Sequence, residues 1–404
     1  MRQHAVLNRA QPSIGTVSVV VPGGLEHGGG IGRQMGYCLQ ALRDRRSDAP
    51  SGATSGIDYR VVDSRGPWFL GSRRIYTVWA GAYLIRAMLT LAWRRFSPTP
   101  SLAHVNITGR GSTIRKIILL TAGQGIGLRY LLHVHDYDYA AFYQGRGRLL
   151  QTLIRRIFRG AQAVIVLGAR DQKLLASALG LPIERITVLP NAVPDPGPNR
   201  AVARPAGDPC RLLFLGYLSE RKGVPELLQA LATPALQARA WHATLAGGGP
   251  VDEFRAMAAA LGIAGRVDFA GWVAADRAEA LRAQSDVLVL PSHAEGLAMA
   301  VLEGLAHGLT VVTTPVGAHP EVIEPGVSGL FVPPGDAAAL AETLARVIDD
   351  GALRAQLSAG ARQRFLQKFD VVGYADRVSQ LHTDLLSRWC GATHPIQSHA
   401  SLGR

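Results

Sequence analysis

Two glutamates, Glu295 and Glu303, stand with seven residues between them in the stretch SHAEGLAMAVLEGLAHG, residues 292–308. Glu295 directly follows a strand-like apolar run, and Glu303 lies within an apolar helical pattern that we expect to start near residues 296–297. Free amides at a helix start can bind a phosphate, and carboxylates accept hydrogen bonds from sugar hydroxyl groups. The spacing therefore favours a ligand with a sugar on each side of its phosphates, as in a nucleoside diphosphate sugar.

A pair of cations, Arg221 and Lys222, occurs in FLGYLSERKG, residues 214–223, between an apolar strand pattern and a helical one. Two cations at the start of a helix oppose its dipole unless they face an anionic ligand. Solvation at the protein surface is the alternative explanation, and the sequence leaves both open.

A glycine-rich turn follows the first strand pattern in VVVPGGLEHGGGIGRQM, residues 19–35. Glycines there allow backbone amides, including that of Gly30, to approach an anion at a helix N-terminus. The turn lacks the dinucleotide-binding pattern, because the nearest acidic candidate for a ribose, Asp63, stands in no convincing position. Tight packing of the turn is the alternative role.

A second polar group ends a strand pattern in LLHVHDYDY, residues 131–139, with His133, His135 and Asp136. Strand alternation places the two histidines on one face. They fit either a ligand site or a buried core, and no third metal ligand is apparent beside them.

Short apolar runs alternate with longer amphipathic ones, as in βαβ units with parallel sheets. A stretch rich in proline, glycine and alanine, residues 190–209, is a linker by composition. We therefore predict an α/β protein with two Rossmann-like domains, 1–195 and 210–369, whose sheets face across a cleft. The expected strands are Thr16–Val21, Tyr59–Asp63, Ala103–Ile107, Arg129–Val134, Ala163–Leu167 and Ile186–Leu189, and then Arg211–Leu215, Ala243–Ala246, Val267–Phe269, Val287–Leu290, Thr310–Thr313 and Gly329–Val332.

Positive charge is concentrated in the first half of the chain. Residues 1–200 hold 26 Lys and Arg against 10 Asp and Glu, a formal charge of +16, whereas residues 201–404 hold 17 against 20. Such asymmetry indicates an anionic partner, either a membrane surface or nucleic acid. The chain shows no pattern of a nucleic-acid-binding module, so we favour the membrane and expect no nucleic acid. The three dispersed cysteines, Cys38, Cys210 and Cys390, favour a reducing compartment.

One apolar segment, residues 75–93, is nearly long enough to span a bilayer. Arg86 at its centre would cost about 2.5–3.5 kcal/mol there. Because strands on both sides belong to one expected sheet, we predict a helix that lies on the membrane, with Arg73, Arg74, Arg94 and Arg95 at its ends. No secretory signal is expected, so the predicted location is cytoplasmic, peripheral to the inner face of the plasma membrane.

Taken in order, these motifs resemble the retaining glycosyltransferases of family 4, the glycosyl transferases group 1, which have the two-domain GT-B fold. The likeness covers nearly the whole chain. The motifs that carry it are Gly29-Gly30 through Arg33, His135-Asp136, VLPNAV (188–193), FLGYLSERKG, LAGGGP (245–250), the Glu-x7-Glu pair, TTPVGAHPEVI (313–323) and GLFVPPGD (329–336).

The resemblance implies a role for each matching residue. Gly30 and Lys222 would contact the donor diphosphate, His135 would lie near the transferred sugar, Glu295 would orient that sugar, and Glu303 would bind the ribose. The phosphates would be held by amides of Gly296, Leu297, Ala298 and Met299. Glu321 would lie near the acceptor.

The sequence departs from the family at two places. Tyr217 replaces a usual arginine, for which Arg221 is a candidate substitute, and Leu297 replaces a usual aromatic residue.

The implied activity is a metal-independent, cofactor-free, retaining hexosyl transfer from a UDP- or GDP-linked sugar to a glycan or lipid-linked acceptor in polysaccharide or glycolipid biosynthesis. The first domain would bind the acceptor, and a C-terminal helix, 370–390, would pack back on it. A nucleotide-sugar epimerase of the same fold is the alternative, and a nucleic-acid-binding protein a weaker one.

Overall fold

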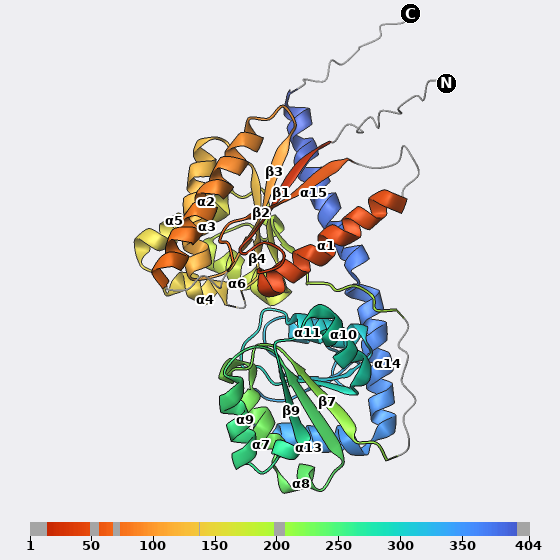
Figure 1. Ribbon diagram of the computed structural model, residues 1–404. Coiled ribbons are helices and arrows are strands. Elements are labelled where there is room, and N and C mark those ends of the chain that lie inside the picture. The colour runs from red at the N-terminus through yellow and green to blue at the C-terminus, as the bar shows by residue number, and fades with distance from the viewer. Residues whose placement is uncertain (1–13, 49–55, 68–72, 137, 198–206, 394–404) are drawn as a thin grey trace, which may run out of the picture. The chain divides into compact units, whose positions relative to one another are not determined.

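The computed structural model describes residues 14–48, 56–67, 73–136, 138–197 and 207–393. It forms two compact units, each containing a six-stranded parallel sheet (Figure 1). The first unit comprises the chain up to Val134, then Phe142–Ile165 and the part from Ala375 onward. The second comprises His135–Ala141 and Val166–Tyr374.

The first sheet has the strand order β2-β1-β3-β4-β5-β6. Its strands are β1 (Gly15–Val21), β2 (Ile57–Asp63), β3 (Ser101–Ile107), β4 (Tyr130–Val134), β5 (Val164–Val166) and β6 (Ile186–Val188). The order reverses direction between β1 and β3, and ligands of such sheets bind beyond the carboxyl ends of the strands at that point. The glycine-rich turn after β1 lies there.

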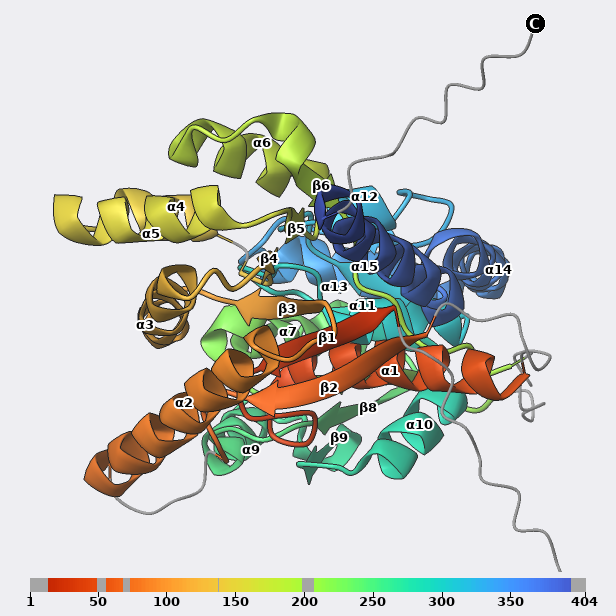
Figure 2. The same ribbon diagram turned by 90° about the horizontal axis from the view of Figure 1, so that it is seen from above.

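Helices cover both faces of the first sheet (Figures 1 and 2). On one face lie α1 (Gly29–Asp48) and α15 (Val371–Thr393), and on the other lie α2 (Arg73–Arg95), α3 (Gly111–Gly125) and α5 (Arg148–Gly160). The remaining short elements in this part of the chain are α4 (Tyr139–Gln144), α6 (Ala169–Leu179) and η1 (Ile183–Arg185). Among the described residues, no helix is long and apolar enough to cross a membrane.

The second sheet has the order β12-β11-β10-β7-β8-β9. Its strands are β7 (Cys210–Leu215), β8 (Trp241–Ala246), β9 (Val267–Gly271), β10 (Val287–Leu290), β11 (Thr310–Thr313) and β12 (Leu330–Phe331). One face carries α7 (Val224–Leu231), α8 (Pro234–Gln237), α9 (Val251–Ala260) and α13 (Ala337–Asp349), and the other α10 (Ala275–Gln284), α11 (Met299–Ala306) and α14 (Gly351–Lys368). The short elements are η2 (Glu220–Lys222), η3 (Ala264–Arg266) and α12 (His319–Val322).

The predicted fold class is confirmed. All twelve expected strands are present in two parallel sheets, with ends within two residues of those expected. The start of the helix that carries Glu303 was expected too early: α11 begins at Met299, after Ala298 in an extended conformation. The reason is that the carbonyl of Gly296 accepts a hydrogen bond from the amide of Ala318, which holds the preceding segment in a loop.

A buried chain of polar rings joins α15 to the first sheet. Tyr59 Oη lies 3.2 Å from His382 Nδ1, His382 Nε2 lies 3.0 Å from His104 Nδ1, and His104 Nε2 lies 3.1 Å from His133 Nδ1. Burial lowers the pKa of His104 to about 3 and that of His382 well below its usual value. His104 and His382 therefore remain neutral at physiological pH. His133 is completely buried, so it is a core residue rather than an open ligand.

Candidate active site

The residues with the strongest predicted chemistry meet beyond the carboxyl ends of β7 and β10. Lys222 Nζ donates a hydrogen bond to Glu295 Oε1, although 73 residues separate the two in the sequence. Both side chains are largely withdrawn from solvent, with 13% of the lysine and 9% of the glutamate exposed. A lysine and a glutamate in contact at this edge can neutralise a phosphate and accept a hydrogen bond from a sugar hydroxyl, respectively.

Two further side chains hold the Glu295 carboxylate. Ser292 Oγ, which is fully buried, donates to Glu295 Oε1 at 2.9 Å. Arg221 Nη1 lies 3.8 Å from Glu295 Oε2 and donates to the carbonyl of Ala294 at 2.6 Å. Tyr217, for which the sequence offered Arg221 as a substitute cation, is 63% exposed. Arg221 therefore brings positive charge to the same carboxylate.

Two glycines let the backbone fold closely around this carboxylate. Gly223, which follows Lys222, has φ +71°, and a Cβ there would overlap the carbonyl oxygen of Pro291. Gly317 has φ +56°, and its Cβ would overlap the carbonyl oxygens of Glu295 and Gly296. L-residues with side chains rarely adopt such φ values, so both positions require glycine for conformation and for space.

Backbone amides gather at the start of α11. Among the described residues, the amides of Gly296, Leu297 and Met299 donate no hydrogen bond, and that of Ala298 donates to His319 Nε2 at 3.4 Å. Leu297 and Met299 are buried. Unsatisfied amides at a helix start can bind an anion, and the assignment of this segment to the donor phosphates stays a prediction.

His319 orients this loop and was not singled out in the sequence. Its Nδ1 lies 3.1 Å from the carbonyl of Thr314, and its Nε2 accepts the amide hydrogen of Ala298. Burial lowers the pKa of His319, opposed by the negative charge of Glu295. The ring is thus neutral, with its proton on Nδ1. The position lies within TTPVGAHPEVI, but a single histidine in a loop gives no local sign of its partner.

Glu303 is buried in α11 and forms an ion pair within the protein. Its Oε2 lies 3.0 Å from Arg282 Nη1, and only 4% of Glu303 and 6% of Arg282 is exposed. Arg282 also pairs with Glu279 at 2.9 Å, and Glu279 contacts His307 Nε2 at 2.8 Å. The carboxylate predicted to bind a ribose therefore already has a guanidinium partner, which the sequence did not indicate.

In the first unit, Gly30 is exposed in the first turn of α1, where helix amides lack intrahelical partners. Asp63 does not have the features of a ribose ligand. Its Oδ1 accepts hydrogen bonds from the amides of Gly23, Arg65 and Gly66 at 2.8–3.0 Å, which fixes the glycine-rich turn beside the end of β2.

A buried lysine lies behind this turn. The fully buried Lys116 donates a hydrogen bond to Ser64 Oγ at 2.5 Å, and burial lowers the pKa of Lys116 to about 7.

His135 and Asp136 directly follow β4 and are half-buried. Glu321, which is predicted to lie near the acceptor, accepts hydrogen bonds from the first amides of α6, from Ala169 at 2.9 Å and from Arg170 at 3.3 Å. Burial, with Glu321, Asp138 and Asp136 nearby, raises the pKa of Asp171 in the same helix to about 6. Glu321 thus caps a helix that lies about 150 residues earlier in the chain.

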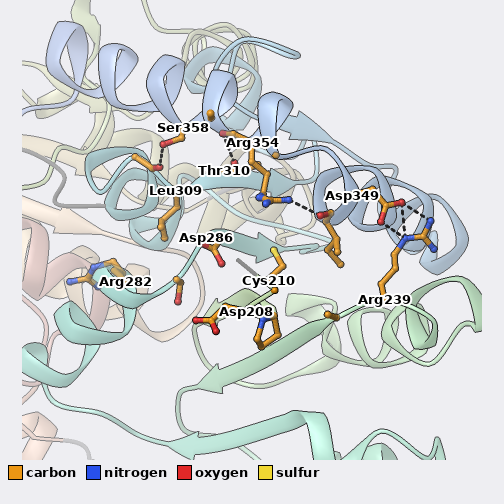
Figure 3. Close-up of a pocket in the computed structure, with 18 of the residues that line it drawn as sticks. Asp208, Cys210, Arg239, Arg282, Asp286, Leu309, Thr310, Asp349, Arg354 and Ser358 are labelled. Carbon is orange, nitrogen blue, oxygen red and sulfur yellow. Dashed lines mark hydrogen bonds and ion pairs between the residues drawn. The ribbon is translucent and has the colours of Figure 1, made fainter. Parts of the chain in front are cut away.

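A pocket of about 820 Å³ lies at the opposite edge of the second sheet (Figure 3). Cys210 and Thr310, which line it, begin β7 and β11, whereas Lys222 and Glu295 follow the ends of strands. Two of its charged side chains form an ion pair: Figure 3 shows Arg239 facing Asp349, and the atoms of the pair lie 2.7–2.9 Å apart. Because ligands of parallel sheets bind at the carboxyl edge, we do not assign the donor to this pocket. In the described part of the chain, no three His, Cys, Asp or Glu residues are placed to hold a metal ion.

The fold and the site define a GT-B protein, and comparisons identify its family. Residues 198–364 match the family described as "Glycosyl transferases group 1", and residues 29–192 match the "Glycosyl transferase 4-like domain". The chain belongs to this family of glycosyltransferases, which confirms the resemblance seen in its motifs.

Individual relatives agree with this. The 2-deoxystreptamine glucosyltransferase of Streptomyces kanamyceticus is 30% identical over 62% of this chain and 69% of its own length. Glycogen synthase of Mycobacterium tuberculosis is 28% identical over 56% of this chain, which spans only about half (55%) of that relative. The structure of sucrose-phosphate synthase from Thermosynechococcus elongatus superposes with a TM-score of 0.73 and 20% identity, over 93% of this chain and 100% of that one.

Proposed function

We propose that the protein is a retaining, metal-independent glycosyltransferase that moves a hexosyl group from a UDP- or GDP-linked sugar to a glycan or lipid-linked acceptor. The observation that carries the proposal is the contact between Lys222 and Glu295 beside the unpaired amides of the α11 start. That arrangement supplies a cation and amides for a diphosphate and a carboxylate for the sugar attached to it. Family membership supports the same reaction class.

In the proposed reaction, the bond between the anomeric carbon and the donor diphosphate breaks, and a bond forms from that carbon to the acceptor oxygen on the same face. The proton of the acceptor hydroxyl passes to the departing phosphate oxygen. Lys222 stabilises the charge that develops on the diphosphate, together with amides of Gly296 to Met299. Glu295 accepts a hydrogen bond from the sugar, and the Lys222–Glu295 contact is exchanged for contacts to the donor.

Three further residues complete the proposed site. Glu303 would accept hydrogen bonds from the ribose, Gly30 would approach the diphosphate through its amide, and His135 would lie beside the transferred sugar. The predicted domain 210–369 would bind the nucleotide sugar, and the predicted domain 1–195 would bind the acceptor. We place the reaction at the cytoplasmic face of the plasma membrane, because the basic first half suits an anionic surface.

The proposal is tested by incubating the full-length protein with labelled UDP- and GDP-linked hexoses and a crude lipid and glycan extract. We expect transfer into the extract with retention of the anomeric configuration, in buffer that contains EDTA. Lys222→Ala should lower the transfer rate by about 10²–10³-fold, the usual effect of losing a group that stabilises transition-state charge. The matched control is Lys368→Ala, because Lys368 is exposed at the end of α14.

Other outcomes would contradict the proposal. Interconversion of the sugar without an acceptor would indicate an epimerase, and an inverted product would exclude the retaining mechanism. A strict metal requirement would exclude the proposed role of Lys222 and the amides as the groups that neutralise the diphosphate. Equal rates for Lys222→Ala and Lys368→Ala would remove the lysine from the site.

A further inference from the structure

Helix α2 has an apolar face that no part of the described chain covers. Its buried face consists of Ala80, Leu84, Ala87 and Leu91, which pack inward. A second apolar row runs along the outer side of the helix and its C-terminal extension. This row, the α2 outer row, consists of Val78, Ala82, Ile85, Leu89, Trp93 and Phe96.

The spacing of the α2 outer row is that of one helix face, since its members recur every three or four residues. Leu89 is 66% exposed, Trp93 74% and Phe96 71%. Trp79, half exposed, stands beside the row. A helix that is apolar on two opposite sides is not explained by packing on its own sheet alone, and a contiguous exposed apolar surface indicates a partner.

The neighbouring helices extend this surface. Helices α2, α3 and α5 lie next to one another over the same face of the first sheet (Figure 2). On α3, Ile114 and Ile118 are nearly half exposed, and on α5 Leu149 is 76% exposed. The outward side of this helical layer thus carries apolar side chains from three helices.

Charge on this layer has one sign. The sequence contains no aspartate or glutamate between Asp63 and Asp136, so α2 and α3 have no acidic residue, and α5 has none either. Exposed arginines stand among the apolar residues, including Arg86 on α2 and Arg156 and Arg159 on α5. A surface that is apolar, aromatic and exclusively basic is complementary to the interface of an anionic bilayer.

Two of the arginines expected to bracket the membrane segment, Arg94 and Arg95, are engaged within the protein. Arg94 Nη1 donates to Ser18 Oγ at 2.6 Å, and Arg95 Nε donates to the carbonyl of Gly127 at 2.9 Å. Both guanidinium groups are therefore engaged within the first unit. The side chains of Arg73 and Arg74 lie outside the described residues. The apolar row, rather than Arg94 and Arg95, is the main described feature available for docking.

We infer that the α2 outer row is a membrane-docking surface that inserts its apolar side chains into the interface of an anionic lipid bilayer. Helix α2 lies parallel to the bilayer plane, with Leu89 and Trp93 directed into it and the arginines of α2 and α5 at the headgroups. A second copy of this chain is a poorer occupant, because two exclusively basic surfaces repel each other. The inference rests on the proposed function only for the idea of a lipid-linked acceptor.

This docking mode predicts a response to salt different from that of a purely electrostatic surface. Interactions between exposed charges are screened within about 8–10 Å at physiological salt, whereas apolar insertion is not weakened by it. High salt should therefore release only part of the protein from vesicles of phosphatidylcholine and phosphatidylglycerol. Complete release would contradict apolar insertion and leave only the electrostatic attraction expected from the sequence.

The decisive experiment measures sedimentation of the full-length protein with these vesicles. Leu89→Asp should lower the partition coefficient about tenfold or more, because a buried leucine side chain contributes about 1.5–3 kcal/mol. The matched control is Leu366→Asp, a half-exposed leucine on α14 of the second unit, which should bind like the wild type. Circular dichroism and thermal unfolding of both variants check that each is folded.

Fluorescence gives a second, independent readout. Lipids brominated on the acyl chain should quench part of the tryptophan emission, and Trp93→Phe should lower that quenched part. The control is Trp272→Phe, since Trp272 is 79% exposed on the second unit. Equal quenching in the two variants, or equal sedimentation of Leu89→Asp and wild type, would overturn the inference. A vesicle-free dimer that Leu89→Asp dissociates would assign the row to self-association instead.

Failure of this inference can be told apart from failure of the proposed function. Donor binding is measured on the same variants by thermal shift with UDP- and GDP-linked sugars, because a ligand that prefers the folded state raises its stability. Leu89→Asp should keep the wild-type shift. Vesicle binding without any donor-induced shift would support the docking surface and refute the transferase, and the reverse result would do the opposite.

Discussion

The ion pair between Arg282 and Glu303 makes a sharp prediction about stability. If the only role of Glu303 were to bind the donor, Glu303→Ala would weaken donor binding and leave the fold intact. In the structure its carboxylate pairs with a guanidinium at 3.0 Å, and both side chains are almost completely buried. Removing one member of a buried ion pair costs about 3–5 kcal/mol, because the other charge remains buried.

The two single substitutions should differ in magnitude. After Glu303→Ala, Arg282 still pairs with Glu279 at 2.9 Å, so the loss should be near the lower limit, about 3 kcal/mol. Arg282→Ala leaves the carboxylate of Glu303 buried without its guanidinium and should cost more, about 5 kcal/mol. The double variant Arg282→Met with Glu303→Leu removes both charges and should lie within about 1–2 kcal/mol of wild type.

Urea denaturation followed by circular dichroism measures these differences, with separate transitions fitted if the two units unfold independently. Arg239→Ala is the control, because its pair with Asp349 is solvent-exposed and should contribute little. A loss below about 1 kcal/mol for Glu303→Ala would refute the structural role of the pair. The ligand role is then read from Glu303→Gln, which keeps the shape and should weaken donor binding roughly tenfold or more.

Three further predictions concern other positions. Burial lowers the pKa of Lys116 from 10.5 to about 7, so between these pH values the unfolded chain binds one more proton than the folded protein. The free energy of unfolding should therefore rise by about 2 kcal/mol from about pH 7.5 to about pH 9, and this rise should be absent in Lys116→Met. Gly317→Ala should introduce about 1–3 kcal/mol of backbone strain and displace the loop of Glu295, which lowers both the turnover and the thermal midpoint. Unchanged turnover would argue against the close approach of Gly317 to the carbonyl of Glu295. Glu321→Gln should weaken the cap of α6 by about 0.5–2 kcal/mol, seen as faster hydrogen exchange at the amide of Ala169, and equal exchange would show that the cap contributes nothing.

The strands were predictable because parallel strands buried on both faces are short apolar runs with clear breaks. The run Val287–Leu290, for example, has the bounds expected from its residues. The start of α11 was less predictable. Its position depends on the hydrogen bond from Ala318 to Gly296, and no local pattern around residue 296 records that partner.

Side-chain partners distant in sequence were the part that the sequence did not reveal. Lys222 and Glu295 were each assigned to the donor, but their direct contact depends on the adjacency of β7 and β10. Arg282 is one of several charged residues in α10, and only packing shows that it faces Glu303. The histidine chain of His104, His133 and His382 likewise requires two strands and the last helix together.

The cap that Glu321 places on α6 has a consequence for dividing the chain. Composition suggests cutting the chain in the linker, residues 190–209. The C-terminal fragment from such a cut would lack Ala169 and Arg170, whose amides donate hydrogen bonds to Glu321. A cut after residue 193 would also remove the parallel bridge between Val193 and Asp370, both of which belong to the second unit. A donor-binding fragment made for crystallisation, or for exchanging halves between relatives, should therefore begin near residue 166 and retain α6.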